Sequence, residues 1–138
     1  MNQLQWWMRI VGGFYLLLTM MNLWGLFINP SFFSGNLPSD FAADALAVRA
    51  FTDAWMVFVF ELGAIGIALL YGARNPAANK ILVWLVVLAE LFRGVLADAI
   101  WIQRGYAATS YGVFIAIHIL IIGTGIWLVR RLEPGPAA

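Results

Sequence analysis

The sequence predicts an all-α integral membrane protein, an antiparallel four-helix bundle with both termini in the cytoplasm. Of its 138 residues, 63% are hydrophobic and only 11% are charged, whereas soluble domains average about 25% charged residues. Four apolar runs, residues 6–28, 49–72, 80–103 and 110–129, each reach the roughly 20 residues that a bilayer crossing needs. The chain length fits a single transmembrane domain over residues 1–138.

The composition also excludes several classes of protein. The chain has no cysteine, so disulfides and cysteine-bound metals are excluded. A net charge of +1 gives no electrostatic reason to bind nucleic acid. A membrane barrel would need alternating strands of about ten residues, which these continuous apolar runs do not provide. The first run is too long for a removable signal peptide, and we expect it to remain as a helix.

The connection after the first run, residues 29–48, is long and interrupted by Pro30, Gly35 and Pro38. A long loop in a small protein is more often a lid or binding loop than an idle linker. Its phenylalanines, Phe33 among them, are equally suited to anchoring the loop in the membrane interface. Ser39 looks like the cap of a helix that runs into the second span.

The second and third runs share the pattern W-x-V-x-x-x-E-L, from Trp55 to Glu61 and from Trp84 to Glu90. The short turn ARNPAANK joins these runs, so they are antiparallel neighbours. Counting back from that turn, both glutamates lie roughly 15 Å into the membrane at 1.5 Å per residue. We therefore expect the two carboxyl groups to face each other near the midplane.

Further ionisable groups extend this site toward the outer loop. On an ideal helix Arg93 shares a face with Glu90, and Asp98 stands about 80° round from it. The fourth run contributes His118, the only histidine, roughly 12 Å from its outer end. Asp53 lies near the outer rim of the second run. The pattern predicts a polar cavity that is closed on the cytoplasmic side and opens toward the long loop.

The cost of burying charge decides how these groups must be arranged. A charge at the bilayer centre costs about 2.5–3.5 kcal/mol on insertion scales, so the groups should face inward and pair. Arg93 is the natural partner for one or two carboxylates, and the excess of carboxylates means that Glu61 or Glu90 should hold its proton. A neutral acid beside an ionised one suits acid–base catalysis. It equally suits a proton relay, and the simplest alternative is a set of ion pairs that hold the helices together.

We expect a membrane-embedded enzyme that needs no cofactor and acts on a lipophilic small molecule. An isoprenoid-, sterol- or quinone-like substrate would undergo isomerisation, cyclisation or epoxide opening by proton transfer. The expected catalytic residues are Glu61, Glu90, Asp98, Asp53, Arg93 and His118. The expected substrate-binding residues are Asn22, Trp24, Phe58, Trp84, Phe114 and Phe33. No metal site is expected, because no ligand-spacing motif surrounds the histidine.

Two other classes of function remain open. A proton-coupled carrier or ion-conducting subunit would use the same charges, but four helices are few for alternating access, so a homodimer would be needed. A structural partner in a larger membrane complex would meet another subunit's charges. Apart from membrane lipid, the enzyme needs only its small-molecule substrate as a partner.

Basic residues beside the runs predict the orientation. One side carries Arg9, Arg74, Lys80, Arg130 and Arg131, and the other carries Arg49 and Arg104. The richer side should face the cytoplasm.

The size, the four runs and the opening WWMRIVGGFYLL resemble small bacterial four-helix membrane proteins of the BphX-like and DoxX-like kind. The local similarity lies in Arg9 followed by Gly12, Gly13 and Phe14, in the first run. The resemblance implies a bacterial inner-membrane protein and assigns no chemistry to any residue.

Overall fold

The structure, a computed structural model, describes residues 3–29 and 31–131, and this part of the chain is helical and free of strands. Its three longest helices are α1 (Gln3–Phe27), α4 (Ala45–Gly72) and α7 (Ala108–Arg131). Each of them is long and apolar enough to cross a membrane, which indicates a membrane protein. Residues 1–2, 30 and 132–138 lie outside the described part, and so do the chain termini whose side of the membrane the sequence predicts.

The third predicted run forms one helical stretch over its full predicted length, but it is not a single α-helix. It consists of α5 (Lys80–Ala89), the π-helix η1 (Glu90–Leu96) and α6 (Ala97–Gln103). A π-helix closes i→i+5 hydrogen bonds and usually occurs as a single turn inside an α-helix. Apart from Lys80 at its first position, the ionisable residues of this stretch lie in η1 and at the start of α6.

The long connection contains two short helices, α2 (Ser31–Ser34) and α3 (Ser39–Ala42). Helix α4 begins separately at Ala45 because the carboxylate of Asp44 caps it, accepting hydrogen bonds from the Leu46 and Ala47 amides at 2.8 and 3.4 Å. The expectation that a helix capped by Ser39 runs into the second span is therefore wrong. The Ser39 hydroxyl donates to the Asp40 side chain, 3.4 Å away, and does not cap a helix.

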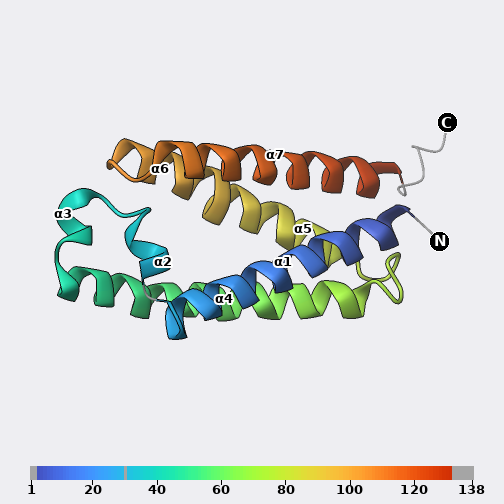
Figure 1. Cartoon of the computed structure of the whole chain (residues 1–138). Coiled ribbons are helices and arrows are strands. Elements are labelled where there is room, and N and C mark those ends of the chain that lie inside the picture. The colour runs from blue at the N-terminus through green and yellow to red at the C-terminus, as the bar shows by residue number, and fades with distance from the viewer. Residues whose placement is uncertain (1–2, 30, 132–138) are drawn as a thin grey trace.

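Helices α1 and α4 lie side by side, α7 packs on α1, and α5 packs on α4 and α7; α6 packs against α7 (Figure 1). Two glycines allow the close crossing of α1 and α4. A Cβ atom added to Gly12 would lie 3.0 Å from the Gly66 carbonyl oxygen, and the converse distance is also 3.0 Å. Small residues at such crossings let helix backbones approach closely in membrane proteins.

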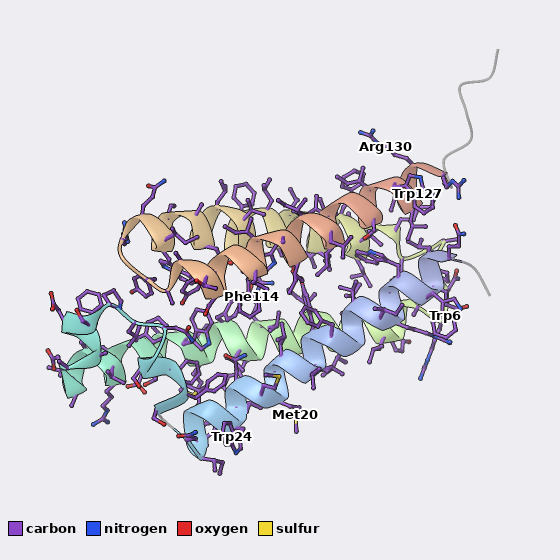
Figure 2. All side chains as sticks on the ribbon, turned by 45° about the horizontal axis from the view of Figure 1, so that its top comes forward. Trp6, Met20, Trp24, Phe114, Trp127 and Arg130 are labelled. Carbon is purple, nitrogen blue, oxygen red and sulfur yellow. The ribbon has the colours of Figure 1, made fainter. Side chains whose placement is uncertain are left out.

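One end of the molecule, where α1 begins and α4 and α7 end, is filled by apolar side chains; we call it the closed end. Its buried core includes Leu4, Met8, Val11, Leu69, Val83, Val86, Leu128 and Val129. The Trp7 indole donates to the Thr124 hydroxyl at 2.9 Å, and the Arg131 guanidinium donates to the Gln3 side chain at 3.4 Å. Trp6, Trp127 and Arg130 surround this end in Figure 2.

The opposite end, which we call the loop end, carries α2 and α3 (Figure 1). The Ala107 amide donates to the Asn36 carbonyl at 3.4 Å, which joins the long connection to the turn before α7. Phe33 of α2 is buried and packs against Phe51 and Trp55 of α4. The connection thus covers the helices at this end.

Candidate functional site

A cavity of about 170 Å³ lies in the half of the molecule that adjoins the loop end. Residues from α1, α2, α4, the stretch from α5 to α6 and α7 line it. Its polar lining includes Tyr15, Asn22, Glu90, Arg93, Asp98 and His118. Its aromatic lining includes Phe14, Phe33, Phe51, Trp55, Phe58, Trp101, Tyr111 and Phe114. The cavity is therefore an aromatic chamber with ionisable groups in its wall.

His118 is held between two buried carboxylates. Its Nδ1 lies 2.5 Å from a Glu90 oxygen, and its Nε2 lies 3.4 Å from Asp98 Oδ2. The other Glu90 oxygen accepts a hydrogen bond from the hydroxyl of Tyr15. Glu90 and Asp98 are each 4% exposed and Tyr15 is 1% exposed. The result is a chain of four polar side chains that crosses from α1 through η1 and α7 to α6.

This arrangement requires His118 and its two carboxylates to hold a proton between them in the cavity wall. A neutral imidazole has one N–H donor and one bare nitrogen, whereas an imidazolium has two donors. Because each nitrogen of His118 faces a carboxylate, either the ring carries both protons or one carboxyl group carries one. Such a group can give up a proton and accept one back, which is the requirement for general acid–base chemistry.

The π-helix explains how one stretch reaches both sides of the same ring. In an α-helix, Glu90 and Asp98 would stand about 80° apart, but the π-turn takes up an additional residue within one turn. Gly94, in the middle of η1, leaves room for the imidazole. A Cβ atom at this position would lie only 2.5 Å from Cγ of His118. The histidine ring thus packs directly on the π-helical backbone.

Arg93 and Glu61 form a separate ion pair, with 3.1 Å between guanidinium and carboxylate. The side chain of Glu61 is 59% exposed, and it does not line the cavity. The expected pairing of Glu61 with Glu90 is therefore not found, because Glu90 binds Tyr15 and His118 instead. Arg93 also lies over the Phe58 ring, 5.1 Å from its centroid, and its buried Nε has no hydrogen-bond partner.

Three further predicted residues do not reach the cavity. Asp53 is exposed and pairs with Arg49 one turn earlier on α4, at 3.8 Å. Trp24, near the end of α1 in Figure 2, is half exposed and packs on Phe32. Trp84 packs against the apolar core instead. In an apolar span, the position of a residue along the sequence indicates its depth in the membrane, but it is only a coarse guide to the helix face on which the residue lies.

Four predicted binding residues do line the cavity: Phe33, Phe58, Asn22 and Phe114. The Asn22 oxygen accepts from the Trp55 indole at 2.8 Å, and its amide donates to the Leu18 carbonyl at 2.8 Å. Phe114, seen on α7 in Figure 2, is stacked against the ring of His118 with 6.4 Å between centroids.

Tyr15 is the functional residue that the sequence reasoning missed. A signal was present, because Tyr15, Thr19 and Asn22 follow the i, i+4, i+7 spacing of one helical face. No role was assigned to this tyrosine from the sequence. A buried tyrosine hydroxyl needs a hydrogen-bond partner, which here is the carboxylate of Glu90.

A groove of about 380 Å³ lies on the other side of the aromatic wall, between α4 and α6. It is lined by Phe51, Ala54, Trp55, Phe58, Arg93, Ala97, Trp101 and Tyr106. Five of these side chains also line the cavity. Trp55 is central in this wall, with its ring centroid 4.6 Å from that of Phe58 and 5.6 Å from that of Trp101.

The histidine and carboxylate side chains of the cavity wall do not meet at a common point, as metal ligands do. Within residues 3–29 and 31–131, no group of three or more histidine, aspartate and glutamate side chains is placed to hold a metal ion. Glu90 and Asp98 approach different nitrogens of His118, so the three side chains bind one another rather than a common point.

Comparison with known proteins gives a family and two relatives. Residues 1–133 match the sequence model of a family described as BphX-like. Two curated relatives, each called an uncharacterized BphX-like protein, come from Burkholderia cepacia and Paraburkholderia xenovorans strain LB400. Each is 38% identical over 81 residues, which span 58% of this chain and 58% of the relative. No solved structure matches the chain.

Proposed function

The chain belongs to the BphX-like family, and from its geometry we propose a membrane-embedded enzyme that transfers a proton at a lipophilic small molecule. One observation carries the proposal: a buried histidine lies between two carboxylates in the wall of an aromatic cavity. Intramembrane ionisable residues are costly and usually mark functional sites.

The chemistry follows from the partners of His118. Its imidazolium gives a proton to a carbon or oxygen atom of the ligand, and the proton that the ligand loses elsewhere returns to the same set of groups. Glu90 orients the ring through Nδ1, and Tyr15 in turn holds Glu90. The proton given to the ligand is thus matched by the proton taken from it, and no cofactor is needed. Isomerisation, cyclisation and epoxide opening all require such a matched transfer.

The size of the cavity narrows the choice of substrate. A cavity of about 150 Å³ holds benzene, so a chamber of about 170 Å³ takes a single ring. A quinone-like head group fits this volume, whereas the four fused rings of a sterol do not. An attached apolar tail would extend through the aromatic wall into the groove between α4 and α6, which we propose as the route of entry from the bilayer.

The membrane arrangement that we propose is an antiparallel four-helix bundle in the bacterial inner membrane. The stretch from α5 to α6 would form the third span, and the closed end would face the cytoplasm. The basic residues at that end support this orientation, because loops rich in lysine and arginine remain on the cytoplasmic side.

The apolar core favours an enzyme over a proton-coupled carrier. The chain of polar side chains from Tyr15 to Asp98 could pass a proton along the cavity wall. Between this chain and the closed end lies the buried core, with Leu4, Met8 and Val83 fully shielded. A carrier needs a second exit, and the packed core of the described residues lies where that exit would have to run, which supports the enzyme.

The test does not depend on knowing the substrate. The purified protein in lipid nanodiscs is incubated in D₂O with a panel of one-ring and isoprenoid lipophiles, and mass spectrometry follows deuterium uptake at carbon and new products. We expect Glu90→Gln and His118→Asn each to reduce the rate about 100-fold or more, since positioned acid–base groups contribute about 10²–10⁴-fold.

Asp53→Asn is the matched control, because it removes a carboxylate that lies outside the cavity and should leave the rate unchanged. Deuterium uptake that persists in folded Glu90→Gln and His118→Asn proteins would refute the proposed proton transfer.

A further inference from the structure

We propose that the ligand of this cavity is a single aromatic ring that carries a hydroxyl group, with the hydroxyl bound at Asp98. The inference rests on the proposed function only in taking the cavity as the ligand site. It adds the chemical class of the ligand and the atoms that recognise it.

The first argument is an unmatched pair of polar groups in the cavity wall. Asp98 is 4% exposed, and its Oδ2, which lies 3.4 Å from His118 Nε2, makes no hydrogen bond among the described residues; nor does the buried Nε of Arg93. A buried polar group without a partner costs free energy, and native structures seldom keep one without a role. Both residues line the cavity, so a ligand there can satisfy them.

Two other polar side chains of the wall, Glu90 and Asn22, are already engaged. Both Glu90 oxygens are occupied, by Tyr15 and by His118. The amide of Asn22 is occupied at both its oxygen and its nitrogen. The two buried atoms without a hydrogen bond therefore call for a donor to a carboxylate and an acceptor for a guanidinium.

A hydroxyl group supplies both, because it has one donor hydrogen and two acceptor lone pairs. A ligand carboxylate has no proton to offer Asp98 and would meet the charge of Glu90 as well. An ammonium group suits Asp98 but has no lone pair for Arg93, whose guanidinium would repel it. Of these three, only the hydroxyl has both the donor that suits Asp98 and the acceptor that suits Arg93.

The second argument is the shape and composition of the chamber. Its volume suits one ring, and aromatic side chains from five helices line it, among them Phe114, Phe58 and Tyr111. Aromatic rings prefer offset or edge-to-face partners with centroids about 4.5–7 Å apart. A hydroxyl on an aromatic ring, with a pKa of about 10 as in free tyrosine, is also a stronger donor to a carboxylate than an aliphatic alcohol.

The test compares four fluorinated probes by ¹⁹F NMR titration of the protein in nanodiscs, with empty nanodiscs to subtract partitioning into lipid. The probes are 4-fluorophenol, 4-fluoroanisole, fluorobenzene and 4-fluorobenzylamine. We expect saturable binding of 4-fluorophenol. The anisole, which cannot donate, and fluorobenzene should bind at least about tenfold more weakly, as a hydrogen bond to a charged group predicts.

Two variants with matched controls locate the probe. Asp98→Asn should weaken 4-fluorophenol binding about tenfold or more, whereas Asp53→Asn should not. Phe114→Trp enlarges a cavity-lining ring and should abolish binding, whereas Phe60→Trp, on the exposed surface of α4, should leave it unchanged.

Equal affinities for 4-fluorophenol and 4-fluoroanisole, tighter binding of 4-fluorobenzylamine, or unchanged binding in folded Asp98→Asn would overturn the inference. The two proposals fail separately. Asp98-dependent binding of 4-fluorophenol without any deuterium transfer refutes the enzyme and supports the ligand class. Glu90-dependent turnover of a larger lipophile, with no binding of any phenol, refutes the ligand class and supports the enzyme.

Discussion

At the scale of single residues, Tyr15 shows how a side chain outside the acid–base set supports it. Its hydroxyl satisfies one oxygen of Glu90, and the other oxygen is left for His118. Without that hydroxyl a buried carboxylate oxygen would have no donor. The tyrosine therefore fixes the position of Glu90, which in turn orients the imidazole.

Replacing Tyr15 with phenylalanine should destabilise the protein by about 1–3 kcal/mol, the usual cost of leaving a buried polar atom unsatisfied. The thermal unfolding midpoint in nanodiscs measures this change. Tyr71→Phe is the control, because Tyr71 is exposed at the end of α4. Equal midpoints for the two variants would contradict the role assigned to the Tyr15 hydroxyl.

Gly94→Ala tests the packing of the histidine on η1. The added Cβ would lie 2.5 Å from Cγ of His118, so the ring must move away from Glu90 and Asp98. We expect a stability loss of about 1–3 kcal/mol from overpacking and altered ¹⁵N shifts of the imidazole. His118 is the only histidine, so ¹⁵N-histidine labelling reports it alone. Gly112→Ala, where a Cβ meets nothing within 4 Å, should leave those shifts unchanged.

At the scale of elements, the predicted third run and the observed one have the same limits, yet the sequence did not reveal the π-helix. Hydrophobic length fixes where a membrane helix starts and stops, whereas a π-turn changes only the hydrogen-bond pattern inside it. The angular argument from Glu90 to Asp98 assumed an α-helix and so did not place both around His118. Boundaries were therefore predictable and side-chain direction was not.

Deleting Phe92 tests the π-helix directly. Phe92 lies in η1 and is exposed, so its removal should convert the π-turn into regular α-helix without opening the core. We expect normal helix content by circular dichroism, with Asp98 rotated away from His118 and binding of 4-fluorophenol lost. Phe92→Ala keeps the chain length and should bind normally. Retained binding in the deletion protein would show that the π-turn is not needed.

The groove between α4 and α6 makes a kinetic prediction. Ala54→Trp fills this groove with a large side chain, and it should slow association of a tailed ligand about tenfold or more while leaving Asp98 and His118 in place. Stopped-flow quenching of tryptophan fluorescence, compared with Ala64→Trp on a part of α4 that does not line the groove, measures the rate. Equal association rates in the two variants would exclude this route.

At the scale of the whole molecule, composition predicted the helical class and the membrane character, and the cost of buried charge predicted part of the site. Glu90, Asp98, Arg93 and His118 were found because an apolar span tolerates such residues only for a reason. The position expected for Glu61 was wrong, because the apolar pattern indicates how deep a residue lies in the membrane but not which side of the helix it occupies. Glu61 pairs with Arg93 and lies outside the cavity. Packing between helices decides which face of a helix turns toward the cavity, and the local sequence does not reveal that choice.

The proposed orientation is open to a direct test because the chain has no cysteine. Single cysteines replace Gly35 in the long connection and Ala77 in the turn after α4, both exposed. A membrane-impermeant maleimide should label Gly35→Cys in intact cells and Ala77→Cys only after permeabilisation. The reverse pattern would place the loop end in the cytoplasm.

The contact between η1 and the imidazole also constrains how the family can diverge. Only a residue without a side chain fits at position 94 while a histidine occupies position 118. A relative in which evolution has replaced this glycine should therefore have lost the histidine as well, and a relative that keeps the histidine should keep the glycine. Genome sequences alone can reveal whether the two positions change together.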